Sequence, residues 1–210
     1  MGAPSPRDRP RREIAGLDPT VQHVGVLLTG SAAGLDLDDV EVEDAELTGL
    51  ALDASRVTRW TLVDATVRSV SLVETDLSDG RWERVTVEGS RWAGCVVDGS
   101  TWEDVTATDV RALRLSARQV TWRRVRFTDC DLTGLDLSGA RLDGVRFDRC
   151  TMPDTEFAGA TVKRADFAEC DLSGVRTVAS LRGATVDQVT LTSMAPAMAA
   201  GLGVRLAQPR

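Results

Sequence analysis

An apolar residue at every fifth position, from Leu37 to Leu172, constrains the fold of this chain more than any other feature. All 28 residues of this series are apolar, although only 42% of the chain is hydrophobic. A second series begins at Leu35, two positions earlier, and contains no charged residue, so the charge falls on the other three positions of each five. Neither the 3.6-residue period of a helix nor simple alternation gives this pattern. It predicts a chain that turns a corner every five residues.

Written as units of five, the sequence contains CDLTG (130–134), LDLSG (135–139) and CDLSG (170–174). These strings resemble the pentapeptide-repeat family, whose consensus is A(D/N)Lxx, and the resemblance covers about residues 35–193. It implies an all-β fold, a right-handed quadrilateral parallel β-helix of about seven to eight coils with four five-residue sides per coil. It also implies a capped solenoid, because terminal coils expose apolar edges and unpaired backbone.

With four sides per coil, residues twenty apart should stack, and the large side chains test this. Two columns are expected: Trp82, Trp102 and Trp122, and Phe127, Phe147 and Phe167. Three alanines offset the indole volume within one coil: Ala107, Ala112 and Ala117. Trp60 occupies a position where small residues prevail, which predicts a local bulge or an outward-turned ring.

The chain ends are expected to differ from the repeats. We expect a flexible tail at residues 1–20, the β-helix at 21–193 and a capping or dimerisation segment at 194–210. Within the β-helix, Val21–Gly34 predicts an irregular first turn with Leu27 and Ala32 in register.

Near the other end, Val175–Val178 is a unit of four residues, after which the pattern resumes through Val189–Ser193. Ser193 is then expected to cap a short helix that Gly201 or Gly203 ends. One helical stripe carries the apolar residues Met194, Met198 and Leu202. This stripe either covers the end of the tube or joins two copies. The family resemblance favours a homodimer, because gyrase-binding members pair through a C-terminal hydrophobic extension.

The residue types argue against chemistry. Cys130, Cys150 and Cys170 lie twenty residues apart, which predicts one buried column of small core residues rather than convergent metal ligands. His23, the single histidine, is expected to be solvated or to cap the first turn. No nucleophile or phosphate-loop motif occurs, so we expect no enzyme, no catalytic residue, no metal and no cofactor. Because no apolar export segment follows Arg11-Arg12, a cytoplasmic location is expected.

Charge is distributed unevenly along the chain, whose net charge is −7. Asp36 to Asp109 carries −12 and Asp129 to Asp171 carries −5. Between them lies a basic band of six arginines, Arg111, Arg114, Arg118, Arg123, Arg124 and Arg126. The acidic segment supplies the predicted partner-binding residues, Asp36, Asp38, Asp39, Glu41, Glu43, Asp44, Glu46, Asp76, Asp79, Glu103 and Asp104. An acidic chain should repel nucleic acid and membrane surfaces, so a protein partner is expected.

Two functions remain open. The first is a DNA mimic that binds a type II topoisomerase, DNA gyrase or topoisomerase IV, and modulates its inhibition or antibiotic resistance. Its support is the acidic rod together with similarity to Qnr-type fluoroquinolone-resistance proteins, among which the absence of loops between Leu35 and Gly174 points to loopless gyrase-binding members. The second is an interaction scaffold for an unrelated protein.

Overall fold

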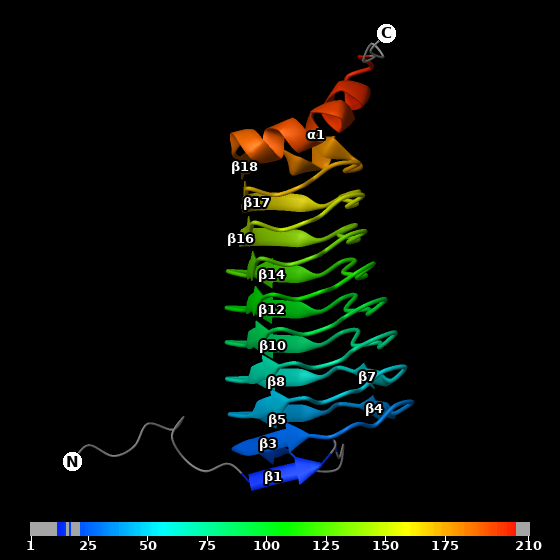
Figure 1. The fold of residues 1–210 in the computed structure, drawn as a ribbon, viewed down its shortest axis with the longest axis vertical. Coiled ribbons are helices and arrows are strands. Elements are labelled where there is room, and N and C mark those ends of the chain that lie inside the picture. Colours follow the sequence, from blue (N-terminus) through cyan, green and yellow to red (C-terminus); the bar gives the residue numbers. More distant parts are fainter. Residues whose placement is uncertain (1–11, 16, 18–21, 205–210) are drawn as a thin grey trace, which may run out of the picture.

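The computed structural model describes residues 12–15, 17 and 22–204, and these form a rod of stacked coils with one helix at its C-terminal end (Figure 1). Equivalent residues in successive coils pair in parallel and lie twenty positions apart, as in Trp82↔Trp102. Each coil therefore has four sides. The expected four-sided parallel β-helix is confirmed, with about eight turns.

The four sides of the rod are named here by their outward-facing segments. Coil 1 comprises residues 35–54, and later coils follow at twenty-residue steps to coil 7, residues 155–174. In coil 1 the four faces are face 1 (36–39), face 2 (41–44), face 3 (46–49) and face 4 (51–54). The same faces continue at twenty-residue steps along the rod, as the strand register shows.

Faces 2 and 3 carry the regular strands. Face 2 contains β2 (His23–Val24), β5 (Glu41–Glu43), β8 (Thr61–Val63), β10 (Arg81–Glu83), β12 (Thr101–Glu103) and β14 (Thr121–Arg123). Face 3 contains β1 (Arg12–Ala15), β3 (Val26–Thr29), β6 (Glu46–Thr48), β9 (Thr66–Arg68), β11 (Thr86–Glu88), β13 (Thr106–Thr108), β15 (Arg126–Thr128) and β18 (Ala184–Val186). Two longer strands run across both faces, β16 (Arg141–Asp148) and β17 (Thr161–Ala168). Face 1 has β4 (Asp36–Asp38) and β7 (Arg56–Thr58), and isolated bridges complete faces 1 and 4.

The last residue of most five-residue units adopts a left-handed backbone, which turns the chain into the next face. Asp39, Arg84 and Asp129 have φ values of 56°, 54° and 53° at this position. Aspartate tolerates this region better than most residues, and glycine enters it freely. At Gly99, with φ 70°, an added Cβ would lie 2.4 Å from Asp79 Oδ1, so a larger residue at this corner would displace the Asp79 carboxylate.

Both predicted aromatic columns exist inside the tube. Trp82 and Trp102 stack with centroids 4.8 Å apart and an interplanar angle of 6°, and Trp122 continues the stack 5.1 Å from Trp102. Phe127 and Phe147 stack at 5.2 Å, and Phe147 and Phe167 at 5.0 Å. All six rings are buried, so the aromatic core is continuous over five coils.

Trp60 corrects one prediction, because its ring turns inward and the strands beside it show no bulge. The side chain is 1% exposed and meets Trp82 edge to face, with centroids 6.2 Å apart. The residue one coil further along the same column is Gly80, where an added Cβ would lie 3.1 Å from the backbone oxygen of Trp60, so the two coils pack closely here. The ladder stays in register on either side, at Asp36↔Arg56 and Glu41↔Thr61.

The N-terminal end also differs from expectation. β1 lies within the segment expected to be a tail and pairs with β3, while residues 1–11 and 18–21 lie outside the described part of the chain. Leu28 rather than Leu27 pairs with Leu47, because the unit between Leu28 and Ala32 is one residue short. Ala32 is in register, as its amide donates to Ala51 O at 2.9 Å.

His23 is buried rather than solvated. It is 4% exposed and pairs with Val42, which faces the core. The expectation of a solvated side chain was wrong because the first turn continues the face 2 ladder, which turns position 23 inward.

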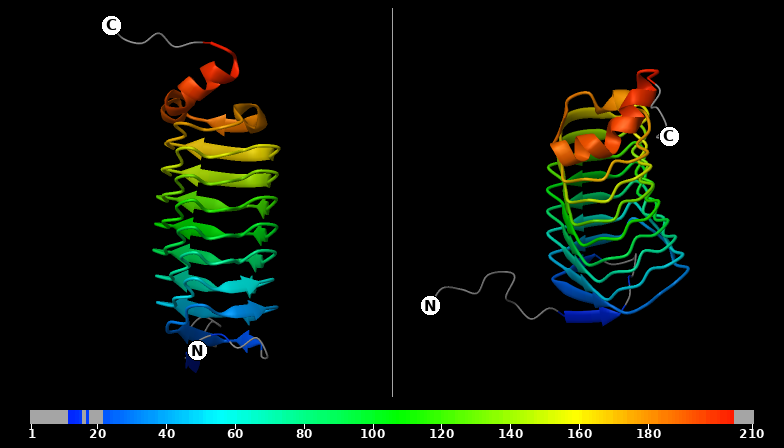
Figure 2. Two further views of the ribbon diagram at one scale, coloured as in Figure 1. Left: turned by 90° about the vertical axis from the view of Figure 1, so that its right-hand side faces the viewer. Right: turned by 45° about the horizontal axis from the view of Figure 1, so that its top comes forward.

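At the C-terminal end, the one-residue shortening after Val175 is confirmed, since Ala165 pairs with Ala184 instead of residue 185. A short 3₁₀ helix (Val178–Leu181) and β18 complete this turn. The expected unit Val189–Ser193 is wrong: α1 spans Gln188–Gly201 and is capped by Asp187, not Ser193. Figure 2 shows α1 lying over the end of the stack. In the described part of the chain, no helix has the length and apolar character needed to cross a membrane.

Truncating the central indole should test the aromatic core. Trp102→Ala removes a fully buried ring that contacts both Trp82 and Trp122, so we expect a loss of about 3–5 kcal/mol in the free energy of unfolding. Thr106→Ala, on the exposed surface of the same coil, is the matched control and should cost less than about 0.5 kcal/mol. Urea denaturation followed by far-UV circular dichroism measures both. Equal midpoints for the two variants would contradict a stacked indole core.

Candidate binding surfaces

The acidic excess of the N-terminal half is concentrated on two adjoining faces. In coils 1 to 4, faces 1 and 2 carry thirteen acidic and four basic residues. Faces 3 and 4 of the same coils, up to Asp109, carry five acidic and two basic residues. Net charge is therefore −9 on one side of the rod and −3 on the other. The sorting follows from the twenty-residue register, which assigns each outward position to a face.

Arginine and aspartate residues pair between neighbouring coils in a repeated geometry, which we call the corner pairs. In each case both residues occupy the left-handed position, and the arginine lies one coil beyond the aspartate. Arg84 donates from Nε and Nη2 to the two carboxylate oxygens of Asp64 at 2.6 and 2.8 Å. Arg124 binds Asp104 with the same two distances. The four corner pairs are Arg59–Asp39, Arg84–Asp64, Arg124–Asp104 and Arg149–Asp129.

These pairs divide the predicted acidic residues into two groups. Five form close ion pairs within the chain: Asp38, Asp39, Glu46, Glu103 and Asp104. Asp76 lies 3.9 Å from Arg56 Nε, and Asp44 is half-buried at the end of face 2. Four are exposed and form no ion pair with another described residue: Asp36, Glu41, Glu43 and Asp79. Three of these four lie in coil 1, so the uncompensated acid is at the N-terminal end of the rod.

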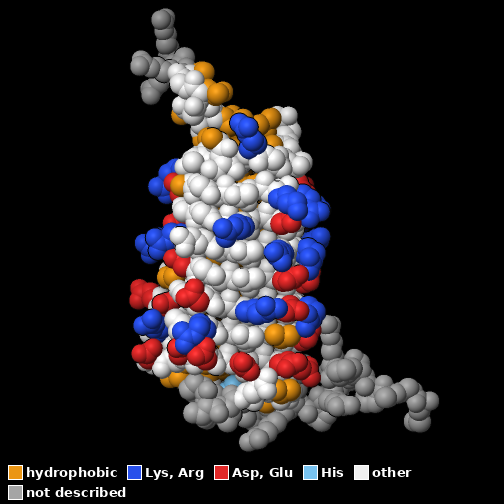
Figure 3. Space-filling model, turned by 180° about the vertical axis from the view of Figure 1, so that it is seen from behind, with side chains coloured by type: hydrophobic (Ala, Val, Ile, Leu, Met, Phe, Trp, Pro, Cys, Tyr) orange, Lys and Arg blue, Asp and Glu red, His pale blue; other side chains and the backbone are white. Residues whose placement is uncertain are grey.

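The basic band forms a belt around the rod rather than a patch. Arg111 and Arg114 lie on face 4, Arg118 on face 1, Arg123 and Arg124 on face 2, and Arg126 on face 3. Arg118 binds Asp98 at 2.9 Å and Arg124 belongs to a corner pair, whereas the other four form no ion pair within the described residues. Figure 3 shows acidic and basic side chains interleaved along the rear of the rod.

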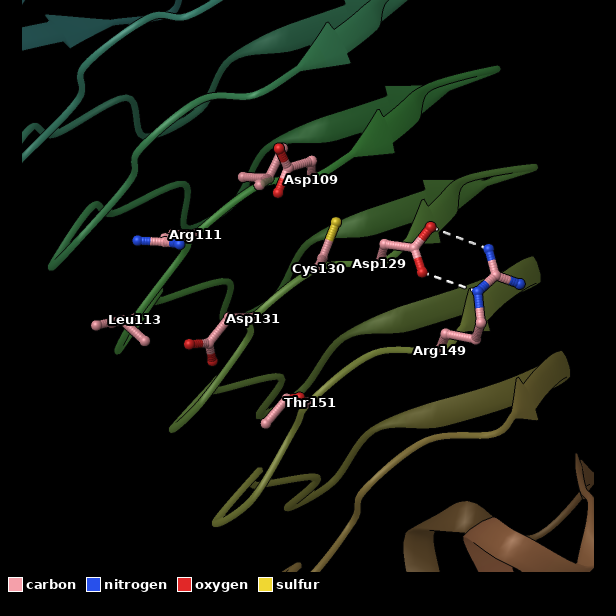
Figure 4. A pocket seen from close by; sticks show the side chains of 9 residues that line it. Asp109, Arg111, Leu113, Asp129, Cys130, Asp131, Arg149 and Thr151 are labelled. Atoms are coloured by element: carbon pink, nitrogen blue, oxygen red, sulfur yellow. Dashed lines mark hydrogen bonds and ion pairs between the residues drawn. The ribbon is translucent and has the colours of Figure 1, made fainter.

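The edge between faces 3 and 4 has a polar hollow of about 470 Å³, shown in Figure 4. Asp109, Asp129 and Asp131 line it from successive coils together with Cys130, and Arg149 closes one side by binding Asp129. Cys130 Sγ donates to the backbone oxygen of Thr128 at 3.2 Å, so the thiol faces the protein rather than a base.

The cysteine column is buried as expected. Cys130, Cys150 and Cys170 are at most 2% exposed and carry free thiols. The adjacent Cys130 thiol raises the pKa of Cys150 to about 12, and burial raises the pKa of Cys95. These two thiols are therefore protonated at neutral pH and unreactive. Within the described residues, no three potential ligands converge on a metal site.

An apolar groove of about 720 Å³ lies beside α1 at the C-terminal end. Met194, Met198 and Leu202 all line it, together with Val178 and Leu181. Exposure rises along the predicted stripe, from 4% at Met194 to 37% at Met198 and 79% at Leu202. The start of the helix therefore caps the core, while its far end presents apolar side chains to solvent.

Three residues that close the last coil were not identified from sequence. Thr190 Oγ1 and Ser193 Oγ accept from the amides of Cys170 and Leu172, both at 2.9 Å, and so satisfy backbone donors that lack a next coil. Asp187 accepts from the Thr190 and Glu169 amides at 2.8 Å, which lowers its pKa. The available signal was Asp187 itself, because aspartate is among the residues preferred at a helix N-cap.

The corner pairs should make the fold sensitive to acid. The arginine hydrogen bond lowers the pKa of Asp39, Asp104 and Asp129 below the ordinary value of 3.8. The ionised aspartates of the corner pairs therefore stabilise the fold fully at any pH above the ordinary pKa of aspartate. This stabilisation is lost as the pH falls through the lower pKa values that these residues have in the folded protein. We expect Tm to be flat from pH 7 to about 5 and to fall below about pH 4. Arg124→Gln, which breaks a corner pair, should lower Tm at pH 7 more than Arg123→Gln, because Arg123 forms no ion pair within the described part of the chain. The reverse order would contradict the assignment of the corner pair.

Comparison with known proteins identifies the repeat. Residues 113–177 match the family described as a pentapeptide repeat region. No curated protein sequence matches the chain. Among solved structures, one of QnrB1, a plasmid-mediated fluoroquinolone resistance protein, is 16% identical and covers 85% of this chain and 100% of its own, with a TM-score of 0.51. HetL, a pentapeptide repeat protein involved in heterocyst differentiation regulation from the cyanobacterium Nostoc, is also 16% identical, covering 68% of this chain and 74% of its own with a TM-score of 0.39. At 16% identity, the QnrB1 structure shows that the two chains share a fold. The five-residue period from Leu37 to Leu172 and the matched region together show that the chain is a pentapeptide-repeat protein.

Proposed function

We propose that this protein is a non-catalytic, cytoplasmic binding protein whose faces 1 and 2 mimic the charge of DNA. The partner would be a protein with a basic DNA-binding groove, first of all a type II topoisomerase such as DNA gyrase or topoisomerase IV. The observation that carries the proposal is the net charge of −9 on those two adjoining faces over coils 1 to 4.

The spacing of this charge supports mimicry of duplex DNA. Four coils at about 4.8 Å each extend over roughly 19 Å, a length in which B-DNA carries about 11 phosphate charges. The −9 already counts the corner-pair arginines Arg59 and Arg84, whereas Arg124 of coil 5 is not counted and binds Asp104 at the C-terminal end of this surface. Asp36, Glu41 and Glu43 lie at the N-terminal end without a neutralising partner among the described residues. A basic groove would therefore meet this end of the rod.

Two further features support the proposal. QnrB1, which shares the fold, is a fluoroquinolone resistance protein, so binding here would be expected to change the response of a topoisomerase to quinolones. The exposed Met198 and Leu202 offer a second surface, through which a homodimer could form as in gyrase-binding members of the family.

Supercoiling by purified gyrase tests this function. Micromolar protein should alter either supercoiling or quinolone-stabilised cleavage, and the effect should weaken steeply as salt is raised. The double variant Glu41→Arg with Glu43→Arg should reduce the effect by at least about tenfold, because both residues lie in the acidic surface. Glu74→Arg, on face 4, is the control. No effect of the native protein on either reaction, or an equal loss in the control, would contradict the proposal.

The alternative function is a scaffold for an unrelated protein. It is favoured by the ion pairs that join acidic and basic side chains of neighbouring coils from coil 2 to coil 6. Arg123 separates the two functions because it lies on face 2 and forms no ion pair with another described residue, whereas its neighbour Arg124 belongs to a corner pair. Arg123→Glu extends the acidic surface, so a mimic should bind a basic groove more tightly. A scaffold that uses the basic belt should instead lose its partner in a pull-down.

A further inference from the structure

The C-terminal end of the rod has an apolar surface that the coils lack. Within the described part of the chain, seven large hydrophobic side chains are exposed, and five of them lie within residues 189–204. No charged residue occurs in α1, whereas every coil of the rod carries charge. A concentration of exposed apolar side chains of this kind marks a binding site. The groove beside α1 is the hollowed part of this surface.

The groove has the size and the lining of a small-molecule site. Its volume of about 720 Å³ lies within the range of about 300–1,000 Å³ that such sites have. Met194, Met198 and the C-cap residue Leu202 follow one another at steps of four residues, so this apolar strip is about 12 Å long. Val178 and Leu181 line the groove from the 3₁₀ helix. An extended alkyl chain of about ten carbons matches the length of the strip.

The charge at the groove has one sign. Two of its sixteen lining residues are basic, Arg176 and Arg182, and none is acidic. Arg176 is held by the preceding coils, because its Nη2 donates to Asp154 O at 3.2 Å and its Nε lies 3.7 Å from Glu156 Oε2. Arg182 is exposed and forms no ion pair with another described residue. Figure 3 shows a basic side chain beside hydrophobic ones at this end of the rod.

We propose that the groove binds a fatty acid of medium chain length, with its alkyl chain along Met194, Met198 and Leu202 and its carboxylate at Arg182. A guanidinium group can bind a carboxylate through two parallel hydrogen bonds. A second copy of the chain fits the groove less well, because a two-fold contact would set the groove against the same residues, among which Arg182 finds no acidic partner. The proposal goes beyond the proposed function and does not depend on it.

Isothermal titration calorimetry of the full chain at pH 7 tests the site with three probes of equal chain length. Dodecanoate, dodecanol and dodecyltrimethylammonium are each used as monomers in solution. Dodecanoate should bind in the micromolar range. Dodecanol should bind at least about tenfold more weakly, and the cationic probe more weakly still, because only the carboxylate pairs with Arg182. Absence of dodecanoate binding, or equal affinity for all three probes, would overturn the proposal.

A substitution at Arg182 separates recognition of the head group from recognition of the chain. Arg182→Glu should weaken dodecanoate binding by at least about tenfold, leave dodecanol binding unchanged and strengthen binding of the cationic probe. Arg123→Glu makes the same charge change on face 2 and should leave all three affinities unchanged. Native affinity for dodecanoate in Arg182→Glu would rule out the assigned carboxylate site.

A substitution in the apolar strip tests the position of the alkyl chain. Met198→Asp introduces a charge at a groove-lining position that is 37% exposed, so dodecanoate and dodecanol should both bind at least about tenfold more weakly. Ala195→Asp places the same charge on an exposed position of α1 that does not line the groove. This control should bind both probes as the native protein does, and an equal loss in the two variants would contradict the assignment.

Sedimentation velocity distinguishes the ligand from a second copy. A homodimer through Met198 and Leu202 would use the side chains that the ligand contacts, so dodecanoate should dissociate such a dimer. A dimer that is lost in Met198→Asp and that excludes dodecanoate would make the second copy the occupant and overturn the proposal. The double variant Glu41→Arg with Glu43→Arg, at the other end of the rod, should bind dodecanoate normally. The gyrase assay and the titration can therefore each fail without the other.

Discussion

Backbone hydrogen bonds between successive coils, which hold residues twenty apart in register, underlie every other feature of this rod. Thr101 N donates to Gly80 O at 2.8 Å, and Arg81 N donates to Trp60 O at 3.0 Å, and such bonds recur on all four faces. These bonds fix each five-residue unit directly above the equivalent unit of the previous coil. Each side chain therefore lies between the side chains twenty positions before it and twenty positions after it. The indole stack inside and the corner pairs outside are two results of this single constraint, one apolar and one ionic. Neither would form if successive coils were free to slide.

The interior of the tube was predictable from the sequence because the apolar period is local and strict. The aromatic columns follow from counting by twenty. Trp60 could not be placed by the same count, since its inward ring packs edge to face on Trp82, a contact between different columns. The helix start was also missed. Val189 and Leu191 fit the five-residue pattern, yet in α1 they are 59% and 38% exposed. At this end of the rod, the chain forms a helix whose Thr190 and Ser193 hydroxyls accept hydrogen bonds from the last coil, instead of forming another five-residue unit.

The binding surfaces were predictable in composition but not in arrangement. Summing charge along the chain correctly found an acidic segment and a basic band. It could not show that Arg124 neutralises Asp104, or that the six arginines surround the rod, because those relations depend on which face each residue occupies. Ion pairs between coils then decide which acidic side chains remain available to bind a partner. Asp39 and Glu41 are two residues apart in sequence, yet the first is bound by Arg59 and the second has no ion pair within the described residues.

The five-residue corner separates the requirements of the core from those of the surface. Loss or gain of one whole unit would keep an apolar residue facing inward, because every unit has the same inward positions. It would also turn everything beyond that point by a quarter of a revolution, moving the charges of face 2 onto a neighbouring face. Only changes of twenty residues would lengthen or shorten the rod and leave each face intact. A chain built in this way can change its length in evolution at little cost to its interior, while its pattern of surface charge is inherited a coil at a time.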